Sequence, residues 1–197
     1  MKYFFEQKNV LDKRHIKKFV KLLDVYIADR LPTEHVLPNL QYGIHYDHIQ
    51  SQIGHLIEKL IGPYEVTACF LQRTKTPLIV HSDYSNNSND KDPYYAILFP
   101  LRFDGPCSTI VFEEKGEKSP LEINYPITNY RYTDDEIKRL QHNKDFVLKR
   151  LSHPKTIEWQ TGSAIVWDRG HFHCSGNFLK NQTTYKDSLV LFTTRTR

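Results

Sequence analysis

The chain has 197 residues, of which 39% are hydrophobic, 13% aromatic and 25% charged, and its formal net charge is +4. This composition excludes a disordered chain, and the length predicts one domain over residues 1–197 with a sizeable core. The three cysteines lie far apart without CxxC spacing, which argues against a disulfide framework or a zinc knuckle and favours a reducing compartment. Because no signal-peptide core or run of about 18 apolar residues occurs, we expect a cytoplasmic protein with no membrane partner.

Residues 1–62 predict two helices that support the rest of the chain. In the first, apolar residues recur at helical spacing from Ile16 to Ile27. Five cations decorate its outer face: Lys13, Arg14, Lys17, Lys18 and Lys21. We interpret them as the solvated side of an amphipathic helix, since the chain has no nucleic-acid-binding fingerprint and no glycine-rich phosphate loop. A nucleic-acid partner is therefore not expected.

The second predicted helix runs from about His45 to Ile61, with its isoleucines and leucines on one stripe. It ends at Gly62-Pro63, because proline cannot continue a helix. Near its start, Asp47 is expected to cap the first turn.

Residues 63–197 have a different texture that predicts a jelly-roll core. Short β-branched or aromatic segments, punctuated by Pro or Gly, predict strands at residues 65–71, 78–80, 94–99, 108–112, 156–159, 163–167 and 188–193. The capping box Thr133 to Glu136 begins a helix that apolar spacing extends to Leu151, within an insertion of about residues 120–154. The expected fold is mainly β with α: a double-stranded β-helix of about eight strands, with the N-terminal helices packed on one sheet.

Two His-x-Asp triplets, at His45 and Asp47 and at His81 and Asp83, each offer a possible pair of metal ligands. Residues i and i+2 point about 200° apart on a helix, whereas on a strand they share one face. The first pair opens a helix, and the second follows the predicted strand Leu78-Ile79-Val80. Only His81 and Asp83 are therefore placed to bind one metal simply.

A third ligand is expected from residues 162–177, which contain His171 and His173. Both histidines point the same way on a strand. We favour His173 because a run of small polar residues, Cys174 to Gly176, follows it.

With these motifs the sequence resembles the iron(II)- and 2-oxoglutarate-dependent oxygenase superfamily, over Val66 to Arg195. In that superfamily an HxD pair closes one strand of the jelly roll, and a distal His arrives from a later strand. His173-Cys174-Ser175-Gly176-Asn177 is similar to the His-x-Ser-Gly-x-Asn run of the phytanoyl-CoA-hydroxylase-like branch, with the Asn one place early. Lys186-Asp187-Ser188 is similar to the family's Arg-x-Ser pair, with Lys for Arg as in the prolyl-hydroxylase-like branch.

The resemblance implies that His81, Asp83 and His173 are the catalytic ligands of an Fe(II) ion. This ligand set leaves three metal positions open for 2-oxoglutarate and O2. Lys186 and Ser188, two apart on one strand face, would hold the remote carboxylate of the cosubstrate. The expected activity is that of a dioxygenase, most simply a hydroxylase of a small-molecule or peptide substrate, releasing succinate and CO2.

Alternatives stay open at this point. His81 and Asp83 could form a surface loop pair, and His171 could replace His173 as the distal ligand. Arg195, in the same final strand, competes with Lys186 as the anchor for 2-oxoglutarate. The same two His and one Asp also bind zinc with an open position, so a cupin-like metal-binding protein or a zinc hydrolase is the second function class. A metal-free binding module is the third.

Several nearby residues are expected to lie in or around the pocket. Gln72 and Arg73 either line the pocket or are solvated, while Trp167 is expected in the core and Cys174 as a small buried filler. The Asn-rich residues 84–93 and the insertion at 120–154 are expected to cover the mouth of the barrel.

Overall fold

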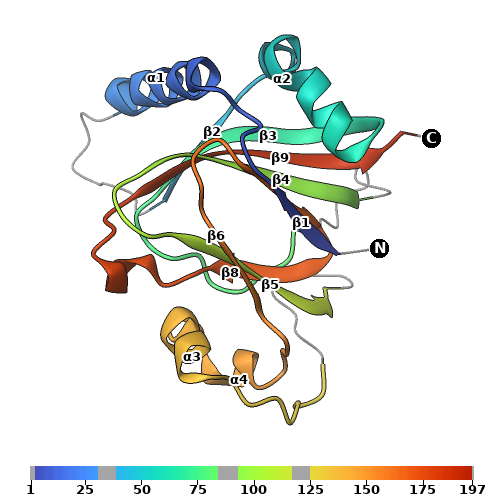
Figure 1. Ribbon diagram of the computed structural model, residues 1–197, viewed down its shortest axis with the longest axis vertical. Coiled ribbons are helices and arrows are strands. Elements are labelled where there is room, and N and C mark those ends of the chain that lie inside the picture. The colour runs from blue at the N-terminus through green and yellow to red at the C-terminus, as the bar shows by residue number, and fades with distance from the viewer. Residues whose placement is uncertain (1–2, 31–38, 84–92, 117–124, 197) are drawn as a thin grey trace.

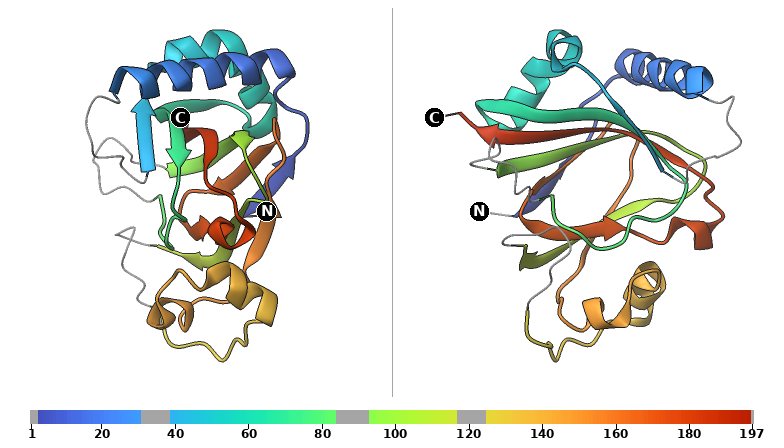
Figure 2. Two further views of the ribbon diagram at one scale, coloured as in Figure 1. Left: turned by 90° about the vertical axis from the view of Figure 1, so that its left-hand side faces the viewer. Right: turned by 180° about the vertical axis from the view of Figure 1, so that it is seen from behind.

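Two antiparallel β-sheets face each other, and helices lie on the outer side of each sheet (Figures 1 and 2). The computed structural model describes residues 3–30, 39–83, 93–116 and 125–196. Within these residues the larger sheet has six strands in the order β1, β7, β4, β9, β3, β2, and the smaller has three in the order β6, β5, β8. This arrangement is the double-stranded β-helix that the sequence predicts.

The strands differ in length. Those of the larger sheet are β1 (Phe4–Gln7), β2 (Asn39–Gly43), β3 (Tyr64–Thr74), β4 (Pro93–Phe103), β7 (Ala164–Asp168) and β9 (Lys186–Arg195). Those of the smaller sheet are β5 (Ser108–Lys115), β6 (Lys155–Glu158) and β8 (His171–Ser175). Alternation along β9 places Ser188 and Val190 on the pocket side and Leu189 and Leu191 against the helices.

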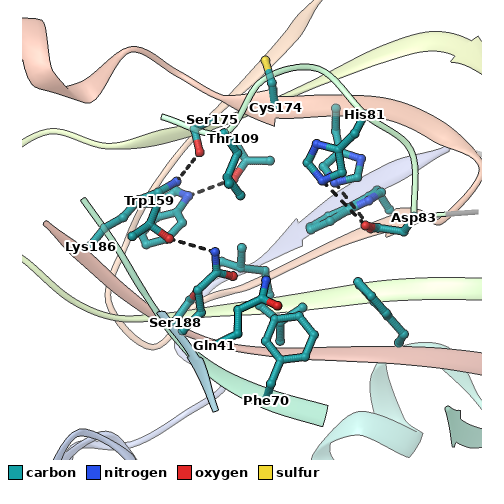
Figure 3. A pocket seen from close by; sticks show the side chains of 18 residues that line it. Gln41, Phe70, His81, Asp83, Thr109, Trp159, Cys174, Ser175, Lys186 and Ser188 are labelled. Atoms are coloured by element: carbon teal, nitrogen blue, oxygen red, sulfur yellow. Dashed lines mark hydrogen bonds and ion pairs between the residues drawn. The ribbon is translucent and has the colours of Figure 1, made fainter. Parts of the chain in front are cut away.

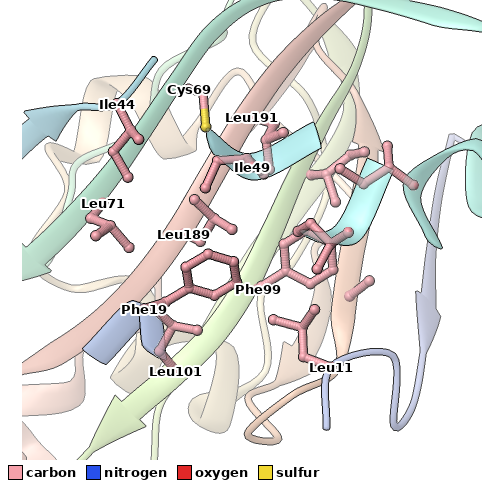
Figure 4. Packing of buried hydrophobic residues seen from close by; sticks show 14 of the residues in the cluster. Leu11, Phe19, Ile44, Ile49, Cys69, Leu71, Phe99, Leu101, Leu189 and Leu191 are labelled. Atoms are coloured by element: carbon pink, nitrogen blue, oxygen red, sulfur yellow. The ribbon is translucent and has the colours of Figure 1, made fainter. Parts of the chain in front are cut away.

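Helices α1 (Lys13–Arg30) and α2 (Tyr46–Ile61) cover the outer face of the larger sheet. Figure 4 shows Phe19 of α1 and Ile49 of α2 over Leu71, Phe99 and Leu189 of the strands below. Full burial of one such side chain stabilises the fold by about 1.5–3 kcal/mol, so this layer fixes the sheet that carries one wall of the pocket. The five cations of α1 are all exposed, as predicted.

The N-terminal region is not only helical, which corrects the prediction for residues 1–62. Strand β1 pairs with β7, and β2 pairs with β3, so both strands become edges of the larger sheet. These strands have only four and five residues, and their sequences carry no local strand pattern. They form because they pair with strands that lie far away in the sequence.

The start of α2 also differs from the prediction. His45 is the N-cap residue and makes no side-chain capping hydrogen bond. Asp47 lies inside the first turn, where its carboxylate is 3.1 Å from His45 Nδ1 in an exposed pair. Asp47 therefore stands in the favourable field of the helix N-terminus but does not cap it.

The helical insertion forms two short helices, α3 (Asp134–Leu140) and α4 (Asp145–Leu148), instead of one. Its predicted capping box is present at Thr133 and Glu136. The helices pack on the outer face of the smaller sheet through a third core cluster that includes Leu140 and Phe172 (Figure 1). The described part of the insertion thus supports that sheet from outside and does not cover the barrel mouth, contrary to the expectation.

A 3-10 helix, η1 (Phe178–Asn181), connects β8 to β9. Residues 84–93 were the other segment expected to cover the mouth of the barrel. Of these, residues 84–92 lie outside the described residues, and Pro93 begins β4. No helix in the described part of the chain is long and apolar enough to cross a membrane.

Candidate metal centre and pocket

A pocket lies between the two sheets and contains most of the residues singled out in the sequence (Figure 3). Its wall on the larger sheet includes Gln41, Phe70, Gln72, Thr74, Leu98, Trp167, Lys186, Ser188, Val190 and Phe192. Its opposite wall includes Leu78, His81, Asp83, Thr109, Trp159, His173, Cys174 and Ser175. Figure 3 shows His81 and Asp83 at one end of this pocket and Lys186 with Ser175 at the other.

The segment that carries His81 and Asp83 runs beside β8. His81 N–H donates to His173 O (3.0 Å), and His173 N–H donates to His81 O (2.8 Å). Only His81 forms a bridge, so the strand predicted at residues 78–80 is wrong as an element. The extended course at this point still lets residues i and i+2 face the same side, and both side chains line the pocket.

The three predicted ligands come together. Ligand atoms of His81, Asp83 and His173 all lie within 4.8 Å of one another. His81 Nε2 is 3.8 Å from Asp83 Oδ1, and His173 Nε2 is 3.4 Å from Asp83 Oδ2. The bridge between His81 and His173, together with the extended backbone from His81 to Asp83, therefore brings these three side chains together. Asp83 and His173 are 90 positions apart in the sequence.

The Nδ1 atoms of both histidines are already used. That of His81 is 2.7 Å from Ile79 O, and that of His173 is 3.1 Å from His171 O. A carbonyl only accepts, so each Nδ1 donates, and in the neutral ring Nε2 then carries the lone pair. Such backbone partners are what holds a metal-binding imidazole in one tautomer and orientation.

The electrostatics of the cluster fit a cation. Burial lowers the pKa of His173 to about 4, so this ring is neutral at pH 7 and needs no deprotonation to bind a metal. Asp83 Oδ2 is buried and has no hydrogen-bond donor among the described residues. A carboxylate oxygen facing imidazole lone pairs without a donor is unfavourable unless a positive ion lies between them. Two nitrogens and one oxygen are a ligand set for Fe(II) or Zn(II).

The far end of the pocket holds a buried cation. Lys186 is 3% exposed, and its Nζ donates to Ser175 Oγ at 2.8 Å. The ammonium lies 4.2 Å from the ring centre of Trp159 and 5.3 Å from that of Phe178. Burial lowers the pKa of Lys186 to about 8, and no carboxylate contacts it among the described residues. Ser188, two residues along β9, lines the same pocket.

The rival residues lie elsewhere. His171 Nδ1 bonds Phe112 O (2.9 Å), and its ring stacks on Tyr3, outside the three-ligand cluster. Arg195 is exposed, packs against Tyr94 and does not line the pocket. His45, at the N-cap of α2, and Asp47, in its first turn, do not line the pocket either.

Neighbouring residues divide between the two faces of their strands. Gln72 is buried and lines the pocket, whereas Arg73 points to the other face and pairs with Asp187. Trp167 is 2% exposed and both fills the core and forms pocket wall, with its ring 4.8 Å from that of His173. Burial raises the pKa of Cys174 to about 12, so its thiol stays protonated as a buried filler.

Sequence reasoning missed two residues of this region. Trp159 covers the ammonium of Lys186, and its indole N–H is fixed by Thr109 Oγ1 (2.9 Å). Arg169 reaches the segment of Asp83 from the turn between β7 and β8. Neither has a local signal, because a tryptophan after a strand and an arginine in a turn are ordinary in any sequence.

Comparisons with protein-family models and with curated proteins find no match. Solved structures are similar in fold. An oxidoreductase of the 2OG-Fe(II) oxygenase family from Burkholderia pseudomallei is 15% identical with a TM-score of 0.57, covering 98% of this chain and 85% of that one. A prolyl-4-hydroxylase from Pseudomonas putida is 11% identical with a TM-score of 0.56, covering 99% and 94%. HygX from Streptomyces hygroscopicus, with nickel and 2-oxoglutarate bound, is 11% identical with a TM-score of 0.59, covering 98% and 83%. The chain therefore has the fold of the 2-oxoglutarate-dependent Fe(II) oxygenases.

Proposed function

We propose that this protein is an Fe(II)- and 2-oxoglutarate-dependent oxygenase. In this proposal His81, Asp83 and His173 hold the iron, and Lys186 with Ser188 holds the remote carboxylate of 2-oxoglutarate. The observation that carries it is the buried ammonium of Lys186, which has no carboxylate partner among the described residues and shares one pocket with the three-ligand cluster. The fold likeness to such oxygenases supports the same assignment.

The ligand set suits this chemistry. Two neutral imidazoles and one carboxylate leave Fe(II) with one net positive charge and three open positions. When bound, iron, 2-oxoglutarate and O2 supply oxidative decarboxylation to succinate and CO2, coupled to oxidation of the substrate. The chain's own part is to hold both imidazoles with Nε2 toward the metal, through the carbonyls of Ile79 and His171.

The cation end of the pocket suits a carboxylate. A bound carboxylate would give Lys186 a charge-assisted hydrogen bond, which is about twice as strong as a neutral one. The Trp159 ring shields the ammonium from water on one side, and this strengthens the attraction to an anion. A zinc hydrolase or a cupin-like protein would have no cosubstrate for a buried cation at the other end of the same pocket to bind.

We propose that the reaction is a hydroxylation. The support for this is that the Pseudomonas putida neighbour in fold is named a prolyl-4-hydroxylase. The substrate in this proposal is a small molecule or peptide that enters beside His81, whose side chain is 26% exposed at the metal end.

The test is anaerobic addition of Fe(II) and then 2-oxoglutarate to the metal-free protein. We expect stoichiometric iron binding, followed by a visible metal-to-ligand charge-transfer absorption on adding 2-oxoglutarate. Lys186→Ala should weaken 2-oxoglutarate binding roughly 30- to 1,000-fold, equivalent to about 2–4 kcal/mol, and leave iron binding unchanged. Arg195→Ala is the matched control and should bind like the wild type, because Arg195 is exposed outside the pocket.

Two results would contradict the proposal. A wild-type protein that binds zinc tightly but shows no affinity for 2-oxoglutarate would favour the hydrolytic alternative. A large loss of 2-oxoglutarate affinity in Arg195→Ala, with none in Lys186→Ala, would contradict the role of Lys186. The reaction class would stand, and Arg195 would be the residue that binds the remote carboxylate.

A further inference from the structure

Arg169 is a buried arginine with an unusual position next to the metal centre. It is 2% exposed, although arginine is almost never fully buried unless its guanidinium is bonded. It lies in the turn between β7 and β8, one residue after Asp168 and two before His171. None of the roles assigned above to iron or 2-oxoglutarate uses it.

Both main-chain polar groups of Asp83 are bonded to Arg169. Asp83 N–H donates to Arg169 O at 3.0 Å, and Arg169 Nη2 donates to Asp83 O at 3.0 Å. The two peptide planes that flank the Asp83 Cα are therefore held by a single residue. These planes set the direction of the Cα–Cβ bond, which is the point from which the carboxylate extends toward the two histidines.

The guanidinium is itself anchored to the larger sheet. Its Nη1 donates to Thr193 O of β9 and to Thr67 Oγ1 of β3, each at 3.3 Å. Its Cζ lies 4.8 Å from the ring centre of Phe192. Arg169 N–H donates to Tyr94 O of β4 at 3.2 Å. The side chain thus connects the Asp83 segment, which runs along the smaller sheet, to two strands of the larger one, and the main-chain N–H of Arg169 adds a bond to a third.

We propose that Arg169 is a positioning residue that fixes the Asp83 carboxylate toward His81 and His173 and so sets the affinity and geometry of the metal site. This inference rests on the proposed function only in that the cluster binds a divalent metal. A planar guanidinium can bond acceptors in two directions at once, whereas the ammonium of lysine is a compact point donor on a flexible stem. The arrangement therefore depends on the fork of Arg169 as well as on its charge.

The test measures Co(II) binding by the metal-free protein through its ligand-field absorption, which reports geometry as well as affinity. Groups that orient metal ligands typically change affinity 10- to 100-fold, and we expect a loss of that size in Arg169→Met. Arg169→Lys should lie between Arg169→Met and the wild type in affinity. At saturating Co(II), both variants should give spectra that differ from that of the wild type.

Arg150→Met is the matched control. Arg150 also donates from Nη1 to a main-chain carbonyl, that of Tyr125 at 2.8 Å, but within the insertion and away from the pocket. Its Co(II) affinity and spectrum should equal those of the wild type, with the folded state of every variant checked by circular dichroism.

The outcomes separate the inference from the function on which it rests. No Co(II) binding by the wild type would refute the metal centre itself. Wild-type affinity and spectrum in Arg169→Met, or in Arg169→Lys if the Met variant does not fold, would overturn the role of Arg169. An equal loss in Arg150→Met would also overturn it, because the effect would then be general destabilisation.

Discussion

Lys186 and Ser175 meet across the gap between the two sheets, with Lys186 Nζ donating to Ser175 Oγ at 2.8 Å (Figure 3). Lys186 begins β9 of the larger sheet, and Ser175 ends β8 of the smaller. In place of water, the ammonium contacts the hydroxyl of Ser175 and the rings of Trp159 and Phe178. Its charged form is therefore poorly solvated, and a carboxylate entering the pocket would complete its solvation.

The depressed pKa of Lys186 predicts a pH-dependent affinity for 2-oxoglutarate. Burial lowers this pKa from 10.5 to about 8, so the free folded protein loses the ammonium charge as pH rises through that value. Affinity should then fall by up to about tenfold per pH unit above pH 8, measured by anaerobic calorimetry. Lys186→Arg should show no such fall, since its guanidinium stays charged.

The groups facing Lys186 do not titrate in the same range. Burial raises the pKa of Cys107 to about 11 and that of Cys174 to about 12, so both thiols stay neutral near pH 8. For stability the sign is opposite to that for binding: between pH 8 and 10.5 the unfolded chain binds the extra proton, so the metal-free protein should become more stable as pH rises. An affinity for 2-oxoglutarate that is flat from pH 7 to 9.5 would contradict the assignment.

Each of the three ligands should be needed for metal binding. His81→Ala, Asp83→Ala and His173→Ala should each bring Fe(II) binding below stoichiometry at concentrations that saturate the wild type, while circular dichroism still shows a folded chain. His45→Ala is the control, because that side chain is 83% exposed at the N-cap of α2 and should not affect metal binding. If His173→Ala still bound Fe(II) and His171→Ala did not, the distal ligand would be His171 and not His173.

Gly116 is expected to tolerate no side chain. A Cβ there would overlap Ser82 Oγ and come within 3.1 Å of Ser82 Cβ, and Ser82 lies between two of the proposed ligands, His81 and Asp83. Gly116→Ala should therefore cost about 1–3 kcal/mol in urea unfolding and weaken metal binding. Gly43→Ala is the control, since a Cβ at Gly43 meets nothing within 4 Å.

A double variant tests whether overlap with Ser82 causes the effect of Gly116→Ala. Removing the Ser82 side chain in Ser82→Gly/Gly116→Ala should restore part of the lost metal affinity, because the overlap disappears. Additive losses in the double variant would show that Gly116 acts in some other way.

Asn143 should stabilise the segment that leads into His81. Its Oδ1 accepts from Val80 N–H at 2.7 Å, and its Nδ2 donates to Leu140 O at 3.0 Å, so it ties the insertion to that segment. Asn143→Ala leaves a buried N–H unpaired and should lower the free energy of unfolding by about 1–3 kcal/mol. Asn181→Ala, at an exposed asparagine, should change it by less than about 0.5 kcal/mol. Equal effects in the two variants would remove this role from Asn143.

Much of the fold, and the grouping of His81, Asp83 and His173, was predictable because the signals are local. The stripe of α1 and the capping box at Thr133 depend on residues three or four apart, and the HxD pair depends on residues two apart. Such spacings translate directly into which side chains share a face. The choice of His81 and Asp83 over His45 and Asp47 followed from this geometry alone.

Only the tertiary structure decided the contacts that join distant segments. β1 and β2 exist because β7 and β3 accept them as partners, and Asp83 is held by Arg169 from 86 residues away. Lys186 and Arg195 stand at opposite ends of β9, about 30 Å apart at the usual rise of a strand. Alternation along the strand places them on opposite faces, but only the tertiary structure shows that the pocket lies at the end and on the face of Lys186. A local pattern specifies which face a side chain takes, but a partner across the sheets depends on how the whole chain closes, and no short stretch of sequence contains that information.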